Sequence, residues 1–270
     1  MQNLPWHSKL VLGLVVFLPI YFMIAALGTK IGLWGWQTGL VGMTFSAGPF
    51  LLGLLVIVAL VSLIIGLVKK PRRKLVIGSG ILGILIPAGL GLMGLTAAGA
   101  AGDNPIHDVA TDTGNPPLFS DEVMAERAES EANPVNDYQL PLGEIEMYAS
   151  LNEAEPELAI KSHAQIINDT YADLSPLPLG GASRADAVAA VAAAMGSMGF
   201  VDIRQDAQAG RVEGVAETFW YGFRDDVVAR IGETEIDFRS VSRVGRSDLG
   251  ANAQRIAELR AKVAEQIGQR

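Results

Sequence analysis

The sequence predicts a membrane-anchored α+β protein: three transmembrane helices, followed by a soluble domain with an antiparallel sheet packed against helices. All 29 Asp and Glu residues of the 270-residue chain lie after position 102. The first 101 residues contain three long apolar runs instead. Near the C-terminus, two segments with helical apolar spacing flank several short strand-like segments. We therefore expect a membrane domain at 1–101 and a soluble α+β domain at 102–270.

The three apolar runs predict membrane spans at about 10–27, 46–68 and 75–98. About 20 mostly apolar residues are needed to cross the hydrocarbon core as a helix. The first run follows a lysine, as a signal peptide does, but its length and the spans after it favour a membrane helix. The third run is rich in glycine, which lets helix backbones approach closely in lipid.

The basic residues of the membrane domain predict its orientation. Five of its seven lysines and arginines lie in the loop 69–74. The positive-inside rule places this loop and the N-terminus in the cytoplasm, so residues 102–270 are expected outside it. We expect an integral membrane protein with an extracytoplasmic domain. The sequence shows no charged residue within the predicted spans, which argues against a pump or channel.

The composition of the soluble domain excludes some partners. It holds all 29 acidic residues but only 14 of the 21 basic ones, a formal charge of −15. A domain this acidic repels nucleic acid and anionic membrane surfaces. The chain has no cysteine, so it has neither disulfides nor thiolate metal ligands.

The soluble domain divides into an irregular part at 102–182 and a regular core at 183–270. Prolines interrupt the first part, where we expect only short helices at 120–131 and 157–168. In the core, Ser183 is expected to cap a helix that ends at Gly199. A final helix is expected after a cap at Ser247 or Asp248. Between these helices we expect strands at 201–206, 211–223, 227–231 and 235–244.

A dense group of arginines and aspartates is the candidate polar cluster. Its members are Arg224, Asp225, Asp226, Arg230, Asp237, Arg239, Arg243, Arg246 and Asp248. Alternation along the last strand puts Asp237, Arg239 and Arg243 on one side. The arginine forks could bind a carboxylate or phosphate ligand in a cleft. The aspartates could instead neutralise them in an internal network, which we consider the better interpretation.

Aromatic residues near the end of the second strand form a candidate apolar wall. Phe219, Trp220 and Phe223 are expected to lie in the protein core. The alternative is that they line one side of a pocket for an apolar ligand such as a lipid or quinone.

The other side chains that could bind a metal or act in catalysis do not form a recognised motif. His107, Asp108 and His163 are the only histidine-based candidates for a metal, and their spacing matches no ligand pattern. For His107 we expect a hydrogen bond in a turn. Ser240 and Ser242 have no histidine in a hydrolase-like context. We therefore expect no cofactor, no metal and no enzymatic activity.

Two long C-terminal stretches resemble the bacterial DUF1499 family. They are GRVEGVAETFWYGFRDDVVARI at 210–231 and IDFRSVSRVGRSDLGANAQRI at 236–256. IHDVATDTGNPPLF at 106–119 and the segment at 171–174 extend the resemblance to roughly 105–262. Many relatives have Tyr-Pro-Asp where this chain has Tyr171-Ala172-Asp173, which puts a rigid turn there in doubt. The resemblance implies a membrane-attached or extracytoplasmic domain with bacterial and plastid relatives, and supplies no catalytic residues.

Two functions of different class remain open after these exclusions. The first is a non-enzymatic interaction or assembly factor of the cell envelope, which meets a protein partner. The second is a binding module for an apolar, possibly anionic, ligand. Such a ligand would place its tail against Trp220 and Phe223 and its head against Arg239 and Arg243.

Overall fold

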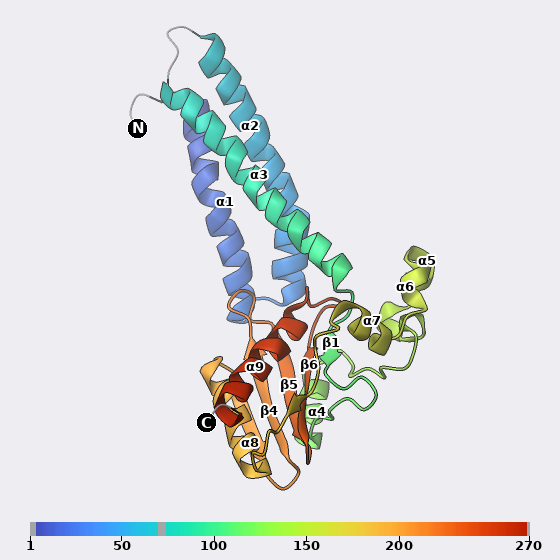
Figure 1. Ribbon diagram of the computed structural model, residues 1–270. Coiled ribbons are helices and arrows are strands. Elements are labelled where there is room, and N and C mark those ends of the chain that lie inside the picture. Colours follow the sequence, from blue (N-terminus) through green and yellow to red (C-terminus); the bar gives the residue numbers. More distant parts are fainter. Residues whose placement is uncertain (1–3, 70–73, 269–270) are drawn as a thin grey trace. The chain divides into compact units, whose positions relative to one another are not determined.

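The structure is a computed structural model, shown in Figure 1, and it describes residues 4–69 and 74–268. The chain forms two compact units. The helical unit consists of Met1–Gly99 together with Thr218–Gly222. The sheet unit consists of Ala100–Glu217 and Phe223–Arg270.

Among the described residues, three helices are long and apolar enough to cross a membrane, and all but the last four residues of the third belong to the helical unit. They are α1 at Trp6–Lys30, the π-helical segment η1 at Gln37–Ala47 continued by α2 at Gly48–Val68, and α3 at Lys74–Asp103. Each is longer than the span expected from the sequence. Residues 70–73, most of the basic loop used to predict orientation, lie outside the described residues.

Glycines of α3 allow close helix packing, but only in its first half. A Cβ atom added at Gly83 would lie 2.6 Å from the Cβ of Ala59, and one at Gly80 would lie 2.7 Å from the Cβ of Leu63. Both neighbours belong to α2. At Gly89 and Gly94 an added Cβ atom would meet nothing within 4 Å. The expected glycine-mediated contact is therefore confirmed for the first half of the helix.

The sheet unit is built on a six-stranded antiparallel sheet, as the sequence predicts. The strands are β1 at Asp108–Ala110, β2 at Leu177–Pro178, β3 at Val201–Asp206, β4 at Arg211–Glu217, β5 at Arg224–Ile231 and β6 at Glu235–Ser242. Their order is β1-β6-β5-β4-β3, and β2 also pairs with β6. Strands β1 and β2 come from the irregular part of the chain, where the sequence predicts no strand.

Helices cover both faces of the sheet (Figure 1). The long helices α8 at Arg184–Ser197 and α9 at Ala251–Ile267 enclose the main apolar core on one face. The short helix α4 at Asp121–Glu129 covers the other face with a smaller apolar cluster. Helix α7 at His163–Thr170, α5 at Leu151–Ala154, α6 at Pro156–Ala159 and the 3-10 turns η2 at Leu142–Glu144 and η3 at Glu146–Tyr148 complete the unit.

Local capping explains where the long helices begin. Ser183 caps α8 as expected and accepts a hydrogen bond from the backbone of Asp186 at 3.1 Å. The expected cap of the last helix is wrong, because the N-cap of α9 is Gly250 with φ of 84°. The carboxylate of Asp248 nevertheless accepts hydrogen bonds from the backbone N–H groups of Gly250 and Asn252. Asp248 therefore stabilises the start of α9 although it lies two residues before the N-cap.

Two expected elements are wrong in extent. The strand predicted at 211–223 ends at Glu217, because Tyr221 and Gly222 take positive φ angles of 62° and 66° in a connecting loop. The helix predicted at 157–168 is interrupted. Ser162 begins a new helix there with a capping box, which needs an extended residue at the cap position.

The sheet unit should fold without the helical unit. Its core is enclosed by its own sheet and helices, and strands β4 and β5 pair along their whole length, from Arg211↔Arg230 to Glu217↔Arg224. We expect residues 102–270, expressed alone, to give one cooperative thermal transition. A gradual melt without a defined midpoint would show instead that the membrane helices are part of this fold.

A buried ionic network as the candidate functional site

The register of β6 decides which side chains form the site. Ile236, Phe238, Ser240 and Ser242 point to the face covered by α9, whereas Asp237, Arg239, Val241 and Arg243 point to the opposite face. The pairing with β5 places Arg230 opposite Asp237 and Val228 opposite Arg239. The expected alternation of this strand is confirmed, and it gathers charged side chains on one face.

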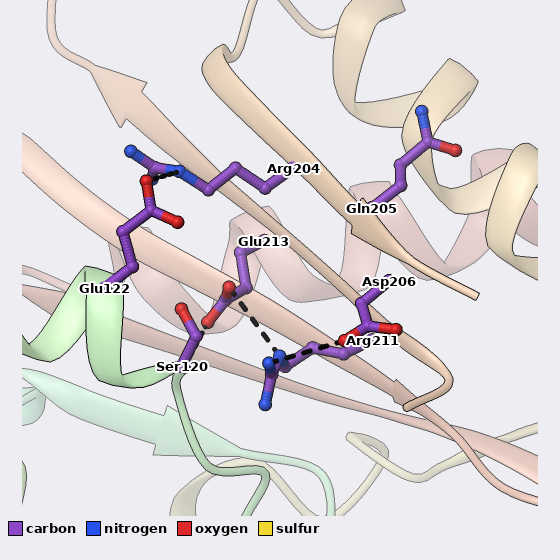
Figure 2. Close-up of a pocket in the computed structure, with 7 residues that line it drawn as sticks. All are labelled: Ser120, Glu122, Arg204, Gln205, Asp206, Arg211 and Glu213. Carbon is purple, nitrogen blue, oxygen red and sulfur yellow. Dashed lines mark hydrogen bonds and ion pairs between the residues drawn. The ribbon is translucent and has the colours of Figure 1, made fainter. Parts of the chain in front are cut away.

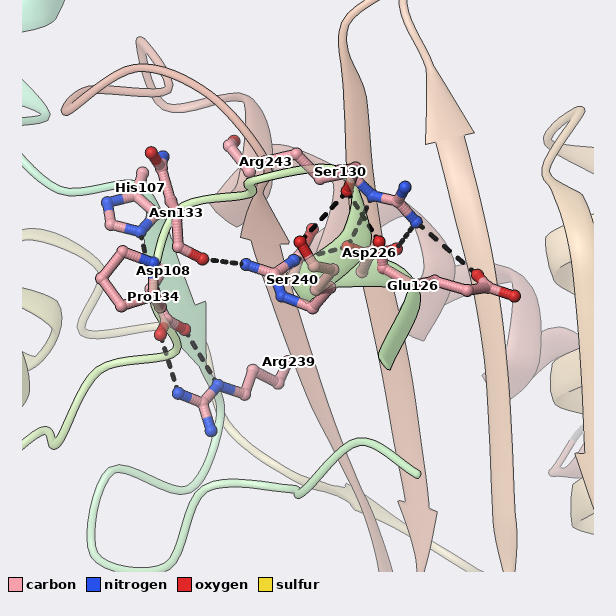
Figure 3. A network of polar contacts seen from close by, with 12 residues as sticks. His107, Asp108, Glu126, Ser130, Asn133, Pro134, Asp226, Arg239, Ser240 and Arg243 are labelled. Carbon is pink, nitrogen blue, oxygen red and sulfur yellow. Dashed lines mark hydrogen bonds and ion pairs between the residues drawn. The ribbon is translucent and has the colours of Figure 1, made fainter. Parts of the chain in front are cut away.

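The centre of the network is an ion pair between Asp108 of β1 and Arg239 of β6 (Figure 3). Arg239 Nε and Nη2 donate to the two carboxylate oxygens of Asp108 at 2.9 and 2.7 Å. The exposed fraction is 0% for Asp108 and 1% for Arg239. Tyr138 donates its hydroxyl to Asp108 Oδ1 at 2.6 Å, and its ring centroid lies 4.9 Å from the guanidinium carbon.

The remaining polar atoms of this pair are also satisfied. Arg239 donates to the backbone oxygens of Pro117 and Asn136, each at 3.2 Å. The backbone N–H of Asn136 donates to the second oxygen of Asp108. Burial alone would raise the pKa of Asp108, but the Arg239 guanidinium outweighs it and holds that pKa below its usual value. Both groups are therefore charged at neutral pH.

A second centre is Asp226 of β5, which lies between two arginines. Arg243 donates to both of its oxygens, at 2.9 and 2.6 Å, and Figure 3 shows this fork with Glu126 on its outer side. Arg127 of α4 donates to Asp226 Oδ2 at 2.5 Å and to the backbone oxygen of Asn133. All three charged groups at this centre are buried.

The other members of the predicted cluster lie outside these two centres. Arg230 pairs with Asp237 and Asp112, and Asp225 pairs with Arg255 on the other face of the sheet. The structure does not bring Arg224, Arg246 and Asp248 into the network. Arg224 pairs with exposed Asp202, Arg246 donates to Ser150, and Asp248 binds backbone N–H groups.

Two histidines far apart in sequence meet beside the Asp108–Arg239 pair. The Nδ2 atom of Asn136 lies 3.2 Å from Nε2 of His163 and 3.5 Å from Nε2 of His107. His107 Nδ1 lies 2.8 Å from the hydroxyl of Tyr148, so this hydrogen bond joins residues 41 positions apart and is not the expected bond within a turn. Among the described residues, no group of three or more His, Asp or Glu is arranged to hold a metal ion.

The burial of His163 gives a measurable acid sensitivity. Burial lowers its pKa from about 6.5 to about 4. As the pH falls from about 6.5 to 4, the unfolded chain therefore binds a proton before the folded chain does, and stability decreases. From pH 7 to pH 5 we expect His163 to account for a loss of about 2 kcal/mol.

The comparison of His163→Phe with the unsubstituted chain isolates this contribution. The phenyl ring can keep the stacking on Tyr138 but does not titrate. Urea unfolding at pH 7 and pH 5 should show a smaller difference for the variant, whatever its absolute stability. Equal pH dependence in the two proteins would show that His163 is not a buried neutral group.

A polar surface depression of about 250 Å³ lies where the start of α4 meets β3 and β4 (Figure 2). Its lining side chains are Ser120, Glu122, Arg204, Gln205, Asp206, Arg211 and Glu213. Arg204 Nε lies 3.3 Å from Glu122, and Arg211 Nε lies 3.7 Å from Glu213. Three carboxylates face two guanidinium groups, so the depression has no excess positive charge for an anion.

The candidate apolar wall does not form in the core. Phe219 and Trp220 lie in the loop between β4 and β5 with exposed fractions of 69% and 49%, and Phe223 is half-buried. Their expected place in a core strand is wrong, because the strand ends before them. Arg239 and Arg243 are enclosed on the sheet, whereas Phe219 and Trp220 are exposed.

The sequence did not identify several residues that complete the network. Arg127, Asn136 and Tyr138 come from the irregular part of the chain, where no apolar period fixes the direction of a side chain. The sequence pattern indicates Asp108 only as a candidate metal ligand beside His107. The sequence holds one signal: the stretch at 106–119, which contains Asp108 and Asp112, is part of the resemblance to the family.

The arrangement can stabilise the fold. The guanidinium groups of Arg239 and Arg243 are enclosed by carboxylates and backbone oxygens. A buried pair lacking one partner is strongly destabilised. An anionic ligand would have to displace Asp108 or Asp226 from an enclosed site.

Comparison with known families supports the resemblance noted in the sequence. Residues 108–263 match the family described as "Protein of unknown function (DUF1499)". The match begins at Asp108, the aspartate at the centre of the network, and includes Arg239 and Asp226. No curated protein and no solved structure matches the chain. The match covers more than half of the chain, which therefore belongs to the DUF1499 family.

Proposed function

We propose that the protein is a membrane-anchored, non-enzymatic interaction or assembly factor of the bacterial envelope. One observation carries this proposal: the side chains best suited to chemistry are enclosed and bonded to one another. Asp108, His107 and His163 have exposed fractions of 0%, and three buried arginines are held by carboxylates. A substrate would need access to such groups.

The charge that remains on the surface indicates the chemistry of a partner. Between Arg127 and Arg184 the chain has ten acidic residues and a single lysine or arginine, Lys161. All ten acidic residues are exposed. The surface of this segment is therefore strongly acidic, so the matching surface of a partner protein carries basic side chains.

A charge-reversal experiment tests this proposal. A photoreactive amino acid at Glu146 should form a discrete adduct of protein size in native membranes, and the adduct should weaken as salt is raised. Glu153→Lys combined with Glu157→Lys should reduce it strongly. The matched control, Glu233→Lys with Glu235→Lys, makes the same charge change in the β5–β6 turn and at the first residue of β6, and should leave the adduct unchanged.

The same preparation tests the alternative function, a binding module for an apolar, possibly anionic, ligand. Lipid extraction and mass spectrometry of the purified protein should find no lipid or quinone at one molecule per chain. A stoichiometric ligand that is lost in Arg243→Ala, together with no protein adduct, would favour the alternative and contradict the interaction factor.

The membrane orientation is part of this proposal. The basic loop at 69–74 favours the cytoplasm, which would place the N-terminus there and residues 102–270 in the periplasm. A C-terminal alkaline phosphatase fusion should be active, and a fluorescent protein that matures only in the cytoplasm should stay dark. The reverse pattern would contradict this orientation.

A further inference from the structure

The loop between β4 and β5 exposes two large aromatic side chains side by side. We call the segment Thr218–Gly222 the aromatic tip. The rings of Phe219 and Trp220 lie 4.9 Å apart, edge to face. They are 69% and 49% exposed, although the sheet unit has an apolar core in which aromatic residues can be buried. Adjacent exposed aromatics indicate a surface that meets something apolar.

Hydrogen bonds within the loop hold the backbone of the aromatic tip in a defined turn. Tyr221 has φ of 62°, which is rare for an aromatic residue, and Gly222 follows with φ of 66°. The hydroxyl of Thr218 donates to the backbone oxygen of Trp220 at 2.6 Å, and the N–H of Gly222 donates to the same oxygen at 2.8 Å. These bonds fix the turn of the chain beside the exposed rings of Phe219 and Trp220.

The contacts of the aromatic tip assign it to the helical unit. The tyrosine hydroxyl of Tyr221 lies 2.6 Å from the hydroxyl of Thr44 in η1. Lys30, the last residue of α1, donates to the backbone oxygen of Phe219 at 3.1 Å. Its ammonium group lies 5.2 Å from the Phe219 ring centroid. Thr44 belongs to the second candidate span, so the tip lies beside segments that enter the membrane.

From these contacts we infer that the aromatic tip is inserted into the headgroup region of the bilayer that holds the three helices. Trp and Tyr favour this depth because one end of each ring is apolar and the other polar. A lysine at the end of a membrane helix favours the same level and attracts lipid phosphates. The occupant of the exposed Phe219–Trp220 surface is therefore lipid, and not a soluble molecule.

Site-directed spin labelling can test this in the full chain, which has no cysteine of its own. Nitroxide labels at Phe219→Cys and Trp220→Cys are measured in phosphatidylglycerol-containing nanodiscs. Collisions with oxygen, which dissolves in lipid, are compared with collisions with a water-soluble nickel chelate. Gln208→Cys on the exposed β3–β4 turn is the control for water, and Leu85→Cys in α3 the control for lipid.

The inference predicts that the tip labels resemble the lipid control. Nickel collisions at 219 and 220 should be several-fold fewer than at 208, with oxygen collisions as frequent as at the shallow end of a span. Tip labels that match position 208 would overturn the inference, because the rings would lie in water. Few collisions with both reagents would also overturn it, because protein would then cover the tip.

A second measurement avoids disturbing the aromatic rings. Trp220→Phe removes only one of the four tryptophans, so the fluorescence difference from the unsubstituted chain reports Trp220. Lipids brominated near the headgroup should quench this difference signal, and aqueous iodide should not. Quenching by iodide alone would contradict insertion even if the cysteine variants fold poorly.

Discussion

Replacing Arg239 by alanine is expected to lower the free energy of unfolding of the sheet unit by about 3–5 kcal/mol. The substitution leaves the carboxylate of Asp108 charged, buried and without its ion-pair partner. It also removes the guanidinium that holds down the pKa of Asp108. Single domains are stable by only about 5–15 kcal/mol, so the loss is a large share of the total.

Arg246→Ala is the matched control for this prediction. It removes an arginine a few residues further on, but Arg246 is exposed and donates to the hydroxyl of Ser150. We expect it to change stability by less than about 1 kcal/mol. Both variants are compared by urea unfolding of residues 102–270, or of the whole chain in detergent. Equal small losses for the two arginines would mean that Arg239 is not in a buried pair.

Removing the charge of Asp226 is expected to be at least as damaging, with a loss on the order of 3–5 kcal/mol for Asp226→Asn. Arg127 and Arg243 both depend on this carboxylate, and both are buried. Without the negative charge, the two guanidinium groups repel one another in a medium that screens charge poorly. One substitution therefore leaves two buried cations without compensation.

The order of the losses tests this prediction more sharply than any single value. Arg127→Met leaves Asp226 paired with Arg243, so it should cost less than Asp226→Asn. Asp202→Asn breaks an exposed pair with Arg224 and should cost less than about 1 kcal/mol. If Arg127→Met and Asp226→Asn had equal effects, the carboxylate would not be shared between the two arginines.

The part of the network that lies on regular strands could be predicted from the sequence. The period of two along a strand places Asp237, Arg239 and Arg243 on one face, and the structure confirms this. The partners could not be predicted in the same way. Asp108 and Arg127 precede Arg239 by more than 100 residues and lie in segments without long regular elements, so their positions depend on tertiary packing.

The position of the aromatic tip could not be predicted from the sequence for a different reason. Phe219 and Trp220 continue the sequence of β4 and have high strand propensity, so they are expected in the core. The strand ends because the chain reverses at Tyr221 and Gly222, and the contacts of this loop lie in the helical unit. Strand propensity carries no information on such a partner, because Lys30 and Thr44 are distant in sequence.

We propose that the arginine–aspartate cluster is an internal network and not a site for an external ligand. A double-mutant cycle with Asp108→Asn, Arg239→Met and the combined variant tests this claim most directly, by urea unfolding at pH 7. If the two side chains form a buried pair, we expect a coupling energy of about 2 kcal/mol or more. The combined variant should then lose less stability than the two single variants lose in sum. Losses that add to within about 0.5 kcal/mol would contradict it, because the two side chains would then act independently.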